Sequence, residues 1–383
     1  MNKIAKSLKD LFKKEVMLSV ALLAALLSLF ITPPSMELVK DINWRTLATL
    51  FMLLSVLEGF KSENIFEPLL KKTRSLSSLK KLTVFFVFCV FFSSMFVTND
   101  VSLIIFVPLT IILFKENGKE RYILPVLTFE NIAAIRGSLL TPFGSPQNLY
   151  LYAKSGISTP DFLKMMFPLW IFSAFLLYIF ISFLYRNNKD EKISAESSPS
   201  ESSSKSWRRG MYVFLFIFVV ASIVTRTRFY PLVLAVVFIT LLIGDRKILI
   251  KTDYVLILTF LCFFTFSSSI CRHPAISEFL KKAVANHEYV WSIILSQIIS
   301  NVPASIVLYP FSQNLRALLY GLDSAGLCSI IGSLASVINL RLFTREYKGK
   351  TFDFIKTFTW ISLIFYAIVV IPQLILIKML PPQ

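Results

Sequence analysis

Two polar breaks interrupt long apolar stretches of this 383-residue chain, and they limit its fold more than any other feature. In each break a hydroxyl residue precedes an asparagine (Asn99 or Asn301), and a proline follows nine positions after that asparagine (Pro108 or Pro310). Hydrocarbon offers backbone polar groups no partners, so such a break persists only where it is buried in protein or lines a cavity. Interrupted segments at corresponding places in two halves of a chain indicate the binding site of a transporter.

The composition places the chain among polytopic membrane proteins. Hydrophobic residues make up 55% of it, and they run in stretches long enough to cross a bilayer. The net charge of +17 does not indicate nucleic-acid binding, because the basic residues gather in loops between apolar segments. The 4 cysteines form no CxxC pair, which argues against a disulfide framework or a metal site. We therefore expect an all-α integral membrane protein with the lipid bilayer as its solvent.

Apolar length predicts about nine spans, arranged as two repeats. The predicted spans are 16–32, 44–60, 121–152, 161–185, 210–226, 229–244, 254–271, 317–343 and 357–380. Segments 82–114 and 288–315 are apolar but split by the polar breaks, so we expect re-entrant hairpins there, with two ordinary spans each as the alternative. Segments 121–152 and 317–343 are long and rich in small residues, which predicts broken helices. The first repeat is residues 1–185 and the second 210–383, joined by a Ser-rich, solvated and flexible linker at 186–209 on the cytoplasmic side.

Loop charge sets the predicted orientation. Lysine and arginine are concentrated in the loops 1–15, 61–81, 115–121, 186–209, 245–253 and 344–356. The positive-inside rule places these loops in the cytoplasm, with the N-terminus inside and the C-terminus outside. Five spans separate the start of segment 44–60 from the start of segment 254–271, and an odd number inverts the second copy. Asp41-Ile-Asn-Trp44 opens the first of these segments and Asp253-Tyr254 the second.

Small, hydroxyl and amide residues in the two broken helices supply the remaining candidates for binding. Gly137–Leu149 holds two prolines and two amides, and Gly326–Leu340 is its counterpart. Carbonyls and hydroxyls of an unwound helix coordinate cations, and half-helix N-termini bind anions. Close helix packing through small residues is the alternative, most evenly balanced at Gly332-Ser333. The candidate binding residues are Thr98, Asn99, Asp100, Arg136, Ser138, Thr141, Gly144, Ser145, Gln147, Asn148, Ser300, Asn301, Ser329, Gly332, Ser333, Ser336 and Asn339.

Two charged candidates stand at membrane depth, where ionisable groups are costly and usually functional. Asp100 is expected to bind a coupling ion, and it also suits the N-cap of the helix that follows. Arg136 is expected to pair with Asp100 or Glu130, or to face an anionic substrate.

The chain resembles the ion-transporter superfamily of secondary carriers, which includes arsenite permeases, citrate–metal carriers and sodium symporters of divalent anions. Asp41–Lys61, Val97–Pro108, Gly137–Leu149 and Ser296–Phe311 carry the resemblance, which looks closest to the bacterial anion-transporter branch. It implies inverted repeats whose hairpins meet near the midplane and an elevator-like or rocking motion. It also implies a sodium site at the tips, here Thr98, Asn99, Asp100, Ser300 and Asn301.

The chain departs from the dicarboxylate carriers at several of these positions. Asp100 and Val302 replace threonines, and Ser145 replaces an asparagine, so the substrate is not defined beyond a small anion or oxyanion-like solute. We expect a secondary active transporter driven by sodium or protons, with no other cofactor. The family also allows a homodimer. An arsenite or antimonite efflux permease and a sodium/proton antiporter are the alternatives, and an ion channel is the rival class. An enzyme is not expected, because no nucleophile–base pair or metal cluster lies at depth.

Overall fold

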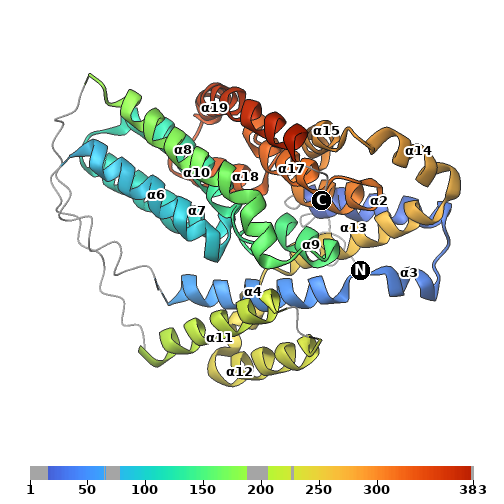
Figure 1. Ribbon diagram of the computed structural model, residues 1–383. Helices are drawn as coiled ribbons and strands as arrows, with labels where there is room; N and C mark the ends of the chain where they lie inside the picture. Colours follow the sequence, from blue (N-terminus) through green and yellow to red (C-terminus); the bar gives the residue numbers. More distant parts are fainter. Residues whose placement is uncertain (1–15, 64, 66–77, 188–205, 226–227, 381–383) are drawn as a thin grey trace.

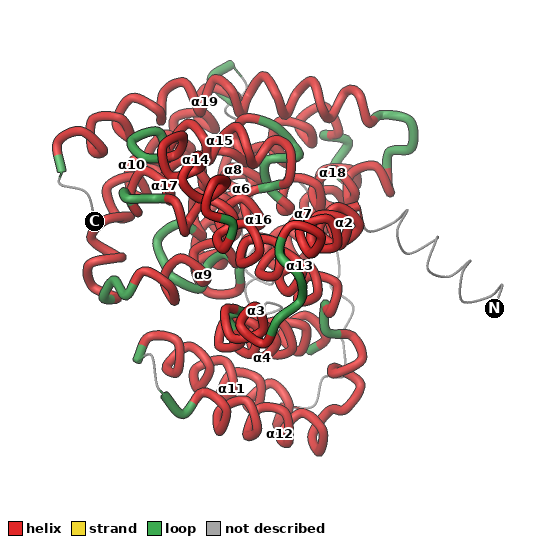
Figure 2. Tube along the Cα trace, turned by 90° about the vertical axis from the view of Figure 1, so that its right-hand side faces the viewer, coloured by secondary structure: helices red, strands yellow, loops and turns green. Residues whose placement is uncertain are grey.

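The structure is a computed structural model that describes residues 16–63, 65, 78–187, 206–225 and 228–380. Most of the predicted linker 186–209, the N-terminal residues 1–15 and part of the loop 61–81 lie outside the described residues. Throughout the described part the chain is helical, with no β-strand (Figure 2). This confirms the all-α class that the apolar composition predicts.

Helices built from the predicted ordinary spans keep close to their expected bounds. They are α2 (Val16–Ile31), α4 (Trp44–Ser62), α10 (Thr159–Leu184), α11 (Ser206–Val224), α12 (Tyr230–Lys251), α13 (Tyr254–Arg272) and α19 (Thr351–Met379). Short helices not predicted from the sequence are α3 (Met36–Asp41) and α14 (Pro274–Val284), which flank the ends of α2 and α13. In α12 the backbone leaves helical geometry at Asp245 (φ −158°, ψ 72°), one residue after the predicted span ends.

Side-chain caps fix where α4 and α13 begin. The carboxamide oxygen of Asn43 accepts the Thr46 N–H at 3.1 Å, and the carboxylate of Asp253 accepts the Leu256 N–H at 3.0 Å. The two cap residues share one backbone conformation, with φ, ψ of −80°, 77° and −74°, 83°. Each cap satisfies an N–H that the first helical turn leaves without a partner. Both openings that the sequence singles out are therefore helix starts of the same kind.

The two segments expected to be hairpins are helix pairs interrupted at one residue. The first pair is α6 (Leu79–Val97) and α7 (Asn99–Glu116), and the second is α15 (Glu288–Ile299) and α16 (Asn301–Leu308), which ends in the 3₁₀ turn η3 (Tyr309–Phe311). The arms α6 and α7 pack against each other, as Figure 1 shows on its left side. They are longer than expected: 19 residues in α6 extend about 28 Å.

The two segments expected to be broken helices are interrupted by short unwound stretches. The 3₁₀ turn η2 (Glu120–Tyr122) leads into α8 (Ile123–Ser138), which is followed by α9 (Pro146–Ser155); α17 (Leu315–Cys328) is followed by α18 (Leu334–Glu346). The hairpins and broken helices interlock, because α7 packs on α18 and α16 packs on α9. Helices α11 and α12 lie on the opposite side of α4, away from this assembly (Figures 1 and 2).

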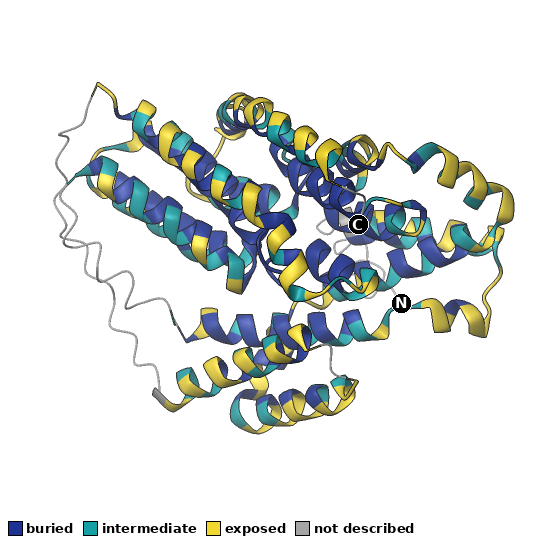
Figure 3. Cartoon of the chain, viewed as in Figure 1, coloured by how far each residue is buried: buried dark blue, intermediate teal, exposed yellow. Residues whose placement is uncertain are grey.

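Exposed apolar stripes show which helices face lipid. On α10, Phe167, Ile171, Phe175, Ile179 and Phe183 are all exposed and recur every four residues, so they occupy one face of the helix. Figure 3 shows such exposed residues on the outer helices, while the interior of the hairpin and broken-helix assembly is buried. A soluble protein does not leave stripes of this kind in water.

Five described helices have the length and hydropathy of a membrane span: α6, α10, α13, α19 and residues 207–224 of α11. The chain is thus a polytopic helical membrane protein. The total of about nine spans and the division into repeats at 1–185 and 210–383 stay predictions.

Candidate functional site

The two polar breaks have the same backbone geometry. Thr98 has φ 71° and ψ 157°, and Ser300 has φ 70° and ψ 159°. A positive φ is unusual for residues with a Cβ atom and marks strain that the surrounding structure must hold. Both residues are buried, as are Asn99 and Asn301 after them. The hydroxyl–asparagine pattern thus corresponds to one repeated backbone conformation.

Each break is held by the backbone of a broken helix. The N–H of Asn99 donates to the carbonyl of Gly144, and the N–H of Asn301 donates to the carbonyl of Gly332, both at 3.2 Å. Neither glycine has space for a side chain. A Cβ atom would lie 2.2 Å from the Ser138 carbonyl oxygen at Gly144 and 2.0 Å from the Ala325 carbonyl oxygen at Gly332. The two glycines therefore allow tight turns whose carbonyls face the hairpin tips.

Hydroxyl groups tie the unwound stretches to the first arm of each hairpin. The Thr141 hydroxyl donates to the carbonyl of Met95, and the Ser329 hydroxyl donates to the side-chain oxygen of Gln297. Positions 95 and 297 each lie three residues before the break in their hairpin. The sequence singled out Thr141 and Ser329 as ligands, and the structure gives both a role in joining hairpin to broken helix.

The second halves of the broken helices begin alike. Ser145 and Ser333 precede α9 and α18, and both are buried with extended backbones. The Asn148 amide donates to the Ser138 carbonyl at 3.4 Å, and the Ser336 hydroxyl donates to the Gly326 carbonyl at 3.4 Å, so each closes its own break. The Ser138 hydroxyl donates to the Ile135 carbonyl within α8.

A polar bridge joins the two broken helices directly. Asn131 on α8 donates to the hydroxyl of Ser336 at 3.0 Å, and Asn339 on α18 donates to the carbonyl of Leu127 at 2.7 Å. All four residues of this bridge are fully buried. Ser336 and Asn339, which sequence reasoning placed among the ligands, thus hold α18 to α8. Asn131 was not predicted, although a lone amide inside an apolar helix is a signal for such a contact.

A cavity of about 270 Å³ opens beside the first tip. Its polar lining includes Thr98, Asp100 and Ser145. Two lysines, Lys61 and Lys251, and two further acids, Glu58 and Asp253, stand in the same lining, and Lys61 pairs with Glu58 at 3.3 Å. The apolar lining comes from α4, α7, α9, α13 and α18. This is the place where predicted site residues from the hairpin and the broken helix meet in a space open to a ligand.

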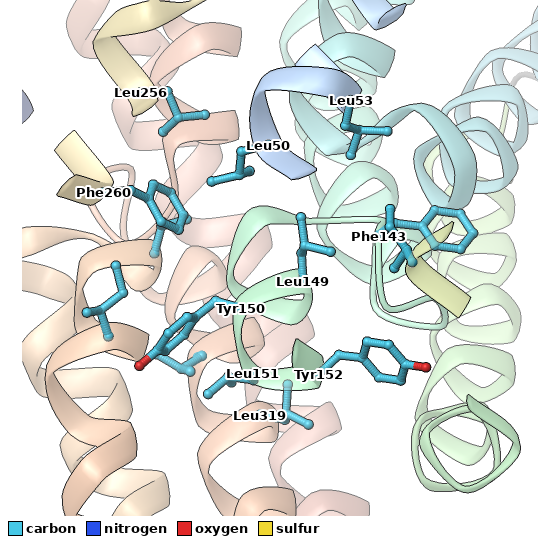
Figure 4. Close-up of a cluster of buried hydrophobic side chains, with 14 of the residues drawn as sticks. Leu50, Leu53, Phe143, Leu149, Tyr150, Leu151, Tyr152, Leu256, Phe260 and Leu319 are labelled. Atoms are coloured by element: carbon cyan, nitrogen blue, oxygen red, sulfur yellow. The ribbon is translucent and has the colours of Figure 1, made fainter. Parts of the chain in front are cut away.

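A second cavity, of about 620 Å³, lies at the other end of α4, α9 and α13. Lys40, Arg45 and Lys154 are among its lining residues. Apolar side chains of the same three helices belong to one buried cluster, part of which Figure 4 shows. The residues of this layer, which we call the apolar layer, are Leu50, Leu149, Tyr150, Leu256 and Phe260. Each is 7% exposed or less. Leu50, Leu149 and Leu256 also line the first cavity and Tyr150 the second, so the layer forms part of the wall of both.

The five positions of the expected sodium set do not share this cavity. Thr98 and Asp100 line it, whereas Ser300 and Asn301 do not. The side-chain oxygen of Asn99 accepts a hydrogen bond from the N–H of Asp100 at 2.9 Å. The side-chain amide of Asn301 donates to the Leu322 carbonyl at 3.4 Å. Within the described residues no group of three or more His, Cys, Asp or Glu side chains is arranged for a metal ion.

Arg136 is fully buried and forms neither expected ion pair. Its Nε donates to the Ser173 hydroxyl at 3.0 Å, and its two terminal nitrogens have no hydrogen-bond partner in the described part of the chain. Glu130 instead accepts from the hydroxyl of Thr110. The pairing of Arg136 with Asp100 or Glu130 was therefore wrong, because α8 directs the guanidinium toward α10 and α17. The acid whose charge acts on it is Asp323, on α17.

Asp323 is the functional candidate that sequence reasoning missed. It is 1% exposed, and the Gln147 side chain reaches toward its carboxyl group from α9, short of a well-formed hydrogen bond. The signal was present: Asp323 is the only acid in the 14 residues of α17. Ionisable residues within membrane segments are a default sign of function.

Comparison of the sequence with known proteins shows which family the chain belongs to. The model of the citrate transporter family matches residues 11–332, which include both breaks and both glycine turns. The chain is 31% identical over 337 residues to an uncharacterized transporter of Methanocaldococcus jannaschii, covering 87% of this chain and 90% of that one. It is 29% identical over 339 residues to the inner membrane protein YbiR of Escherichia coli, covering 86% and 88%. The interrupted helices, the buried polar tips and these matches agree: the chain belongs to the citrate transporter family of membrane transporters.

Proposed function

We propose that this protein is a secondary active carrier that moves a small anion across the membrane by alternating access. The observation that carries the proposal is the cavity at the first tip, where Thr98, Asp100 and Ser145 meet apolar walls from five helices. Its lining carries the lysines Lys61 and Lys251 and the acids Glu58, Asp100 and Asp253, so an anion and a coupling cation would each find opposite charges there. A concave apolar space with a few converging polar groups is the usual form of a small-ligand site.

The apolar layer favours a carrier over a channel. A conducting channel needs a path of polar or hydrated lining across the membrane. Here the two cavities lie at opposite ends of the same helices. Leu149 in the wall of the first, Tyr150 in the wall of the second and Phe260 belong to one buried apolar cluster. A site open to one end and closed to the other is what one state of an alternating-access cycle requires.

Citrate is the first substrate to test, because the matching family is the citrate transporter family. A cavity of about 270 Å³ suits a small carboxylate or oxyanion, near the low end of ordinary ligand pockets. Arsenite or antimonite efflux and sodium/proton antiport are kept as outcomes of the same assay. In that assay a transported metalloid, or sodium exchange without an anion, identifies them.

The coupling ion is sodium or a proton, and Asp100 is its proposed ligand at the tip. One carboxylate oxygen of Asp100 has no hydrogen-bond partner in the described part of the chain, although the residue lines the cavity. Thr98 and Ser145 add hydroxyl oxygens nearby in the same lining. Hard cations prefer such oxygen ligands.

The membrane is proposed to be the cytoplasmic membrane of a prokaryote, with the N-terminus inside and the C-terminus outside. Under this topology the cavity with Lys61 and Lys251 faces the cytoplasm, since both residues belong to predicted inner loops. The structure then corresponds to a state open to the inside.

The test is uptake of radiolabelled citrate into liposomes that hold the purified full-length protein. A carrier shows saturable uptake and counterflow, in which unlabelled citrate inside drives labelled citrate in. A sodium gradient and a pH gradient are imposed separately to identify the coupling ion. Flux that does not saturate and shows no counterflow would support the channel class and overturn the proposal.

A further inference from the structure

Two buried opposite charges lie outside the cavity and are used by none of the contacts described for the tips. Arg136 on α8 is 0% exposed and Asp323 on α17 is 1% exposed. Neither carboxylate oxygen of Asp323 and neither terminal nitrogen of Arg136 has a hydrogen-bond partner among the described residues. The two groups act on each other electrostatically, yet they lie too far apart to count as an ion pair.

The groups around this pair are bound elsewhere. The Tyr320 hydroxyl donates to the Met165 carbonyl at 2.7 Å, and the Tyr289 hydroxyl donates to the side-chain oxygen of Gln373 at 2.7 Å. Ser324 also contacts Gln373, at 2.9 Å. The charged and titratable groups that act on the pair or on its neighbours are Arg136 of α8, Tyr289 of α15, Arg316 and Tyr320 of α17, and Tyr366 of α19. The Gln147 side chain, from α9, also acts on Asp323. Helix α16 has no titratable side chain, and the charged residues of α18 are exposed.

A buried carboxylate without an ion pair is costly, because the hydration that it loses is not regained. A proton relieves this cost, since it converts the carboxylate into a neutral acid. A sodium ion does not fit as well. It needs several oxygen ligands, and the Tyr320 hydroxyl is already bound to Met165. The positive charge of Arg136 would also repel it.

We propose that Asp323 binds a proton that is coupled to transport, at a site separate from the ion proposed at Asp100, and that Arg136 balances the carboxylate charge after the proton leaves. This assignment rests on the proposed carrier function and specifies its coupling. On binding, the proton joins a carboxylate oxygen of Asp323 and the local charge rises by one. On release, it passes to water and the carboxylate charge faces Arg136 again. No other bond forms or breaks.

The position of the pair connects this charge change to the tips. Asp323 lies on the helix that leads into the Gly332 turn, and Arg136 on the helix that leads into the Gly144 turn. Gln147 is in the first turn of α9, where Ser145 and Pro146 line the cavity. A change of charge between α8 and α17 therefore acts on the two helices that lead into the glycine turns. These turns hold both hairpin breaks, and a transport step must be controlled there.

The experiment compares proton-driven citrate uptake with citrate counterflow in liposomes. We expect Asp323→Asn to lower the ratio of proton-driven uptake to counterflow by about tenfold or more. Asp323→Glu, which restores an acid, should recover most of the ratio. The matched control is Asp161→Asn, an exposed acid at the start of α10, which should leave the ratio at the wild-type value. An unchanged ratio in Asp323→Asn, or equal loss of both fluxes in a folded protein, overturns the proposal.

Asp323→Asn leaves Arg136 without a counter-charge, so a double variant guards against misfolding. Arg136→Met with Asp323→Leu removes both charges, and replacing buried charges by apolar residues of similar volume is often neutral for stability. It should show the same lowered ratio, and a retained ratio would also overturn the proposal.

A second measurement does not depend on the substrate. Infrared difference spectra of the purified protein between acid and alkaline pH should contain a protonated-carboxyl band that Asp323→Asn lacks. An identical spectrum in the variant overturns the proton site. If the wild type neither takes up nor exchanges citrate, citrate fails as the substrate, while the infrared result still decides the role of Asp323.

Discussion

At the scale of single residues, the two tip asparagines do different things with the same backbone. Both donate their N–H to a glycine carbonyl, at 3.2 Å. Asn99 uses its side-chain oxygen on the next N–H, whereas Asn301 uses its amide nitrogen on the Leu322 carbonyl. The remaining amide groups of each side chain are left for a ligand or for water.

Asn99→Ala and Asn301→Ala should each abolish citrate uptake while leaving expression and folding largely intact. The backbone N–H bonds remain in alanine, so the stability loss should be about 1 kcal/mol per side-chain hydrogen bond. Uptake in liposomes and the melting temperature in detergent measure the two effects. Asn117→Ala at the end of α7 is the matched control, because it removes a similar amide bond, to Leu113, away from the tips. Normal transport in both tip variants would make the asparagines purely structural.

Asp100→Asn should flatten the response of uptake to sodium or to pH, whichever the wild type shows. The substitution keeps the size of the side chain but removes the charge that attracts a cation. Uptake is measured over a series of sodium concentrations and of pH values, with Asp161→Asn as the exposed control. The structure puts Asp100 in the first turn of α7, after the N-cap Thr98, so the expected capping role was wrong. An active Asp100→Asn protein with both profiles unchanged would reduce Asp100 to a charge that favours the start of α7.

At the scale of elements, the hairpins and broken helices form two matching units. In each unit a hairpin break is bound by the carbonyl of a glycine turn, and a hydroxyl of that turn binds the first hairpin arm. The turns depend on the missing side chains of Gly144 and Gly332, because a Cβ atom at either would meet backbone oxygen at 2.2 Å or less.

Gly144→Ala and Gly332→Ala should therefore move the carbonyls that hold the tips. Crowding of this kind costs about 1–3 kcal/mol, and we expect a lower melting temperature together with loss of citrate uptake. Gly210→Ala on α11 serves as the control, since its Cβ would have open space. It should be neutral or slightly stabilising, because alanine favours helix over glycine by about 1 kcal/mol. Wild-type uptake in Gly144→Ala would show that the turn does not position the tip.

The sequence predicts these elements well where polarity conflicts with an apolar background. Thr98-Asn99 and Ser300-Asn301 were found because hydrocarbon excludes such residues unless the fold satisfies them. Their partners could not be found in the same way. The Gly144 and Gly332 carbonyls are backbone groups, and nothing in a residue's identity tells which N–H they accept.

Long-range neighbours were harder still. Lys61 and Lys251 share a cavity lining although 190 positions separate them, and the sequence only assigned both to loops. Arg136 was matched to the wrong acids because helix orientation, not spacing, decides that α8 turns it toward Asp323. Composition and breaks therefore give the class and the tips, while tertiary packing gives the cavity and the charge pair.

At the scale of the whole molecule, the apolar layer must open for transport to occur. The cavity at the first tip and the cavity at Arg45 and Cys271 lie at opposite ends of α4, α9 and α13. In an alternating-access carrier the two ends face opposite sides of the membrane. Cys271 lines the second cavity, so its natural thiol can be used to measure from which side of the membrane that cavity is accessible.

Thiol labelling should reveal this arrangement. In a protein whose other three cysteines are changed to alanine, a membrane-impermeant maleimide should label Cys271 from one face only. With Cys271 also changed to alanine, Val101→Cys, in the lining of the first cavity, should be labelled from the other face. Right-side-out and inside-out vesicles separate the two faces, and citrate should slow labelling at Val101→Cys because ligand and reagent compete for one space. Labelling of both thiols from the same face would place the cavities on one side of the membrane, and the apolar layer could then not be the barrier that transport must open.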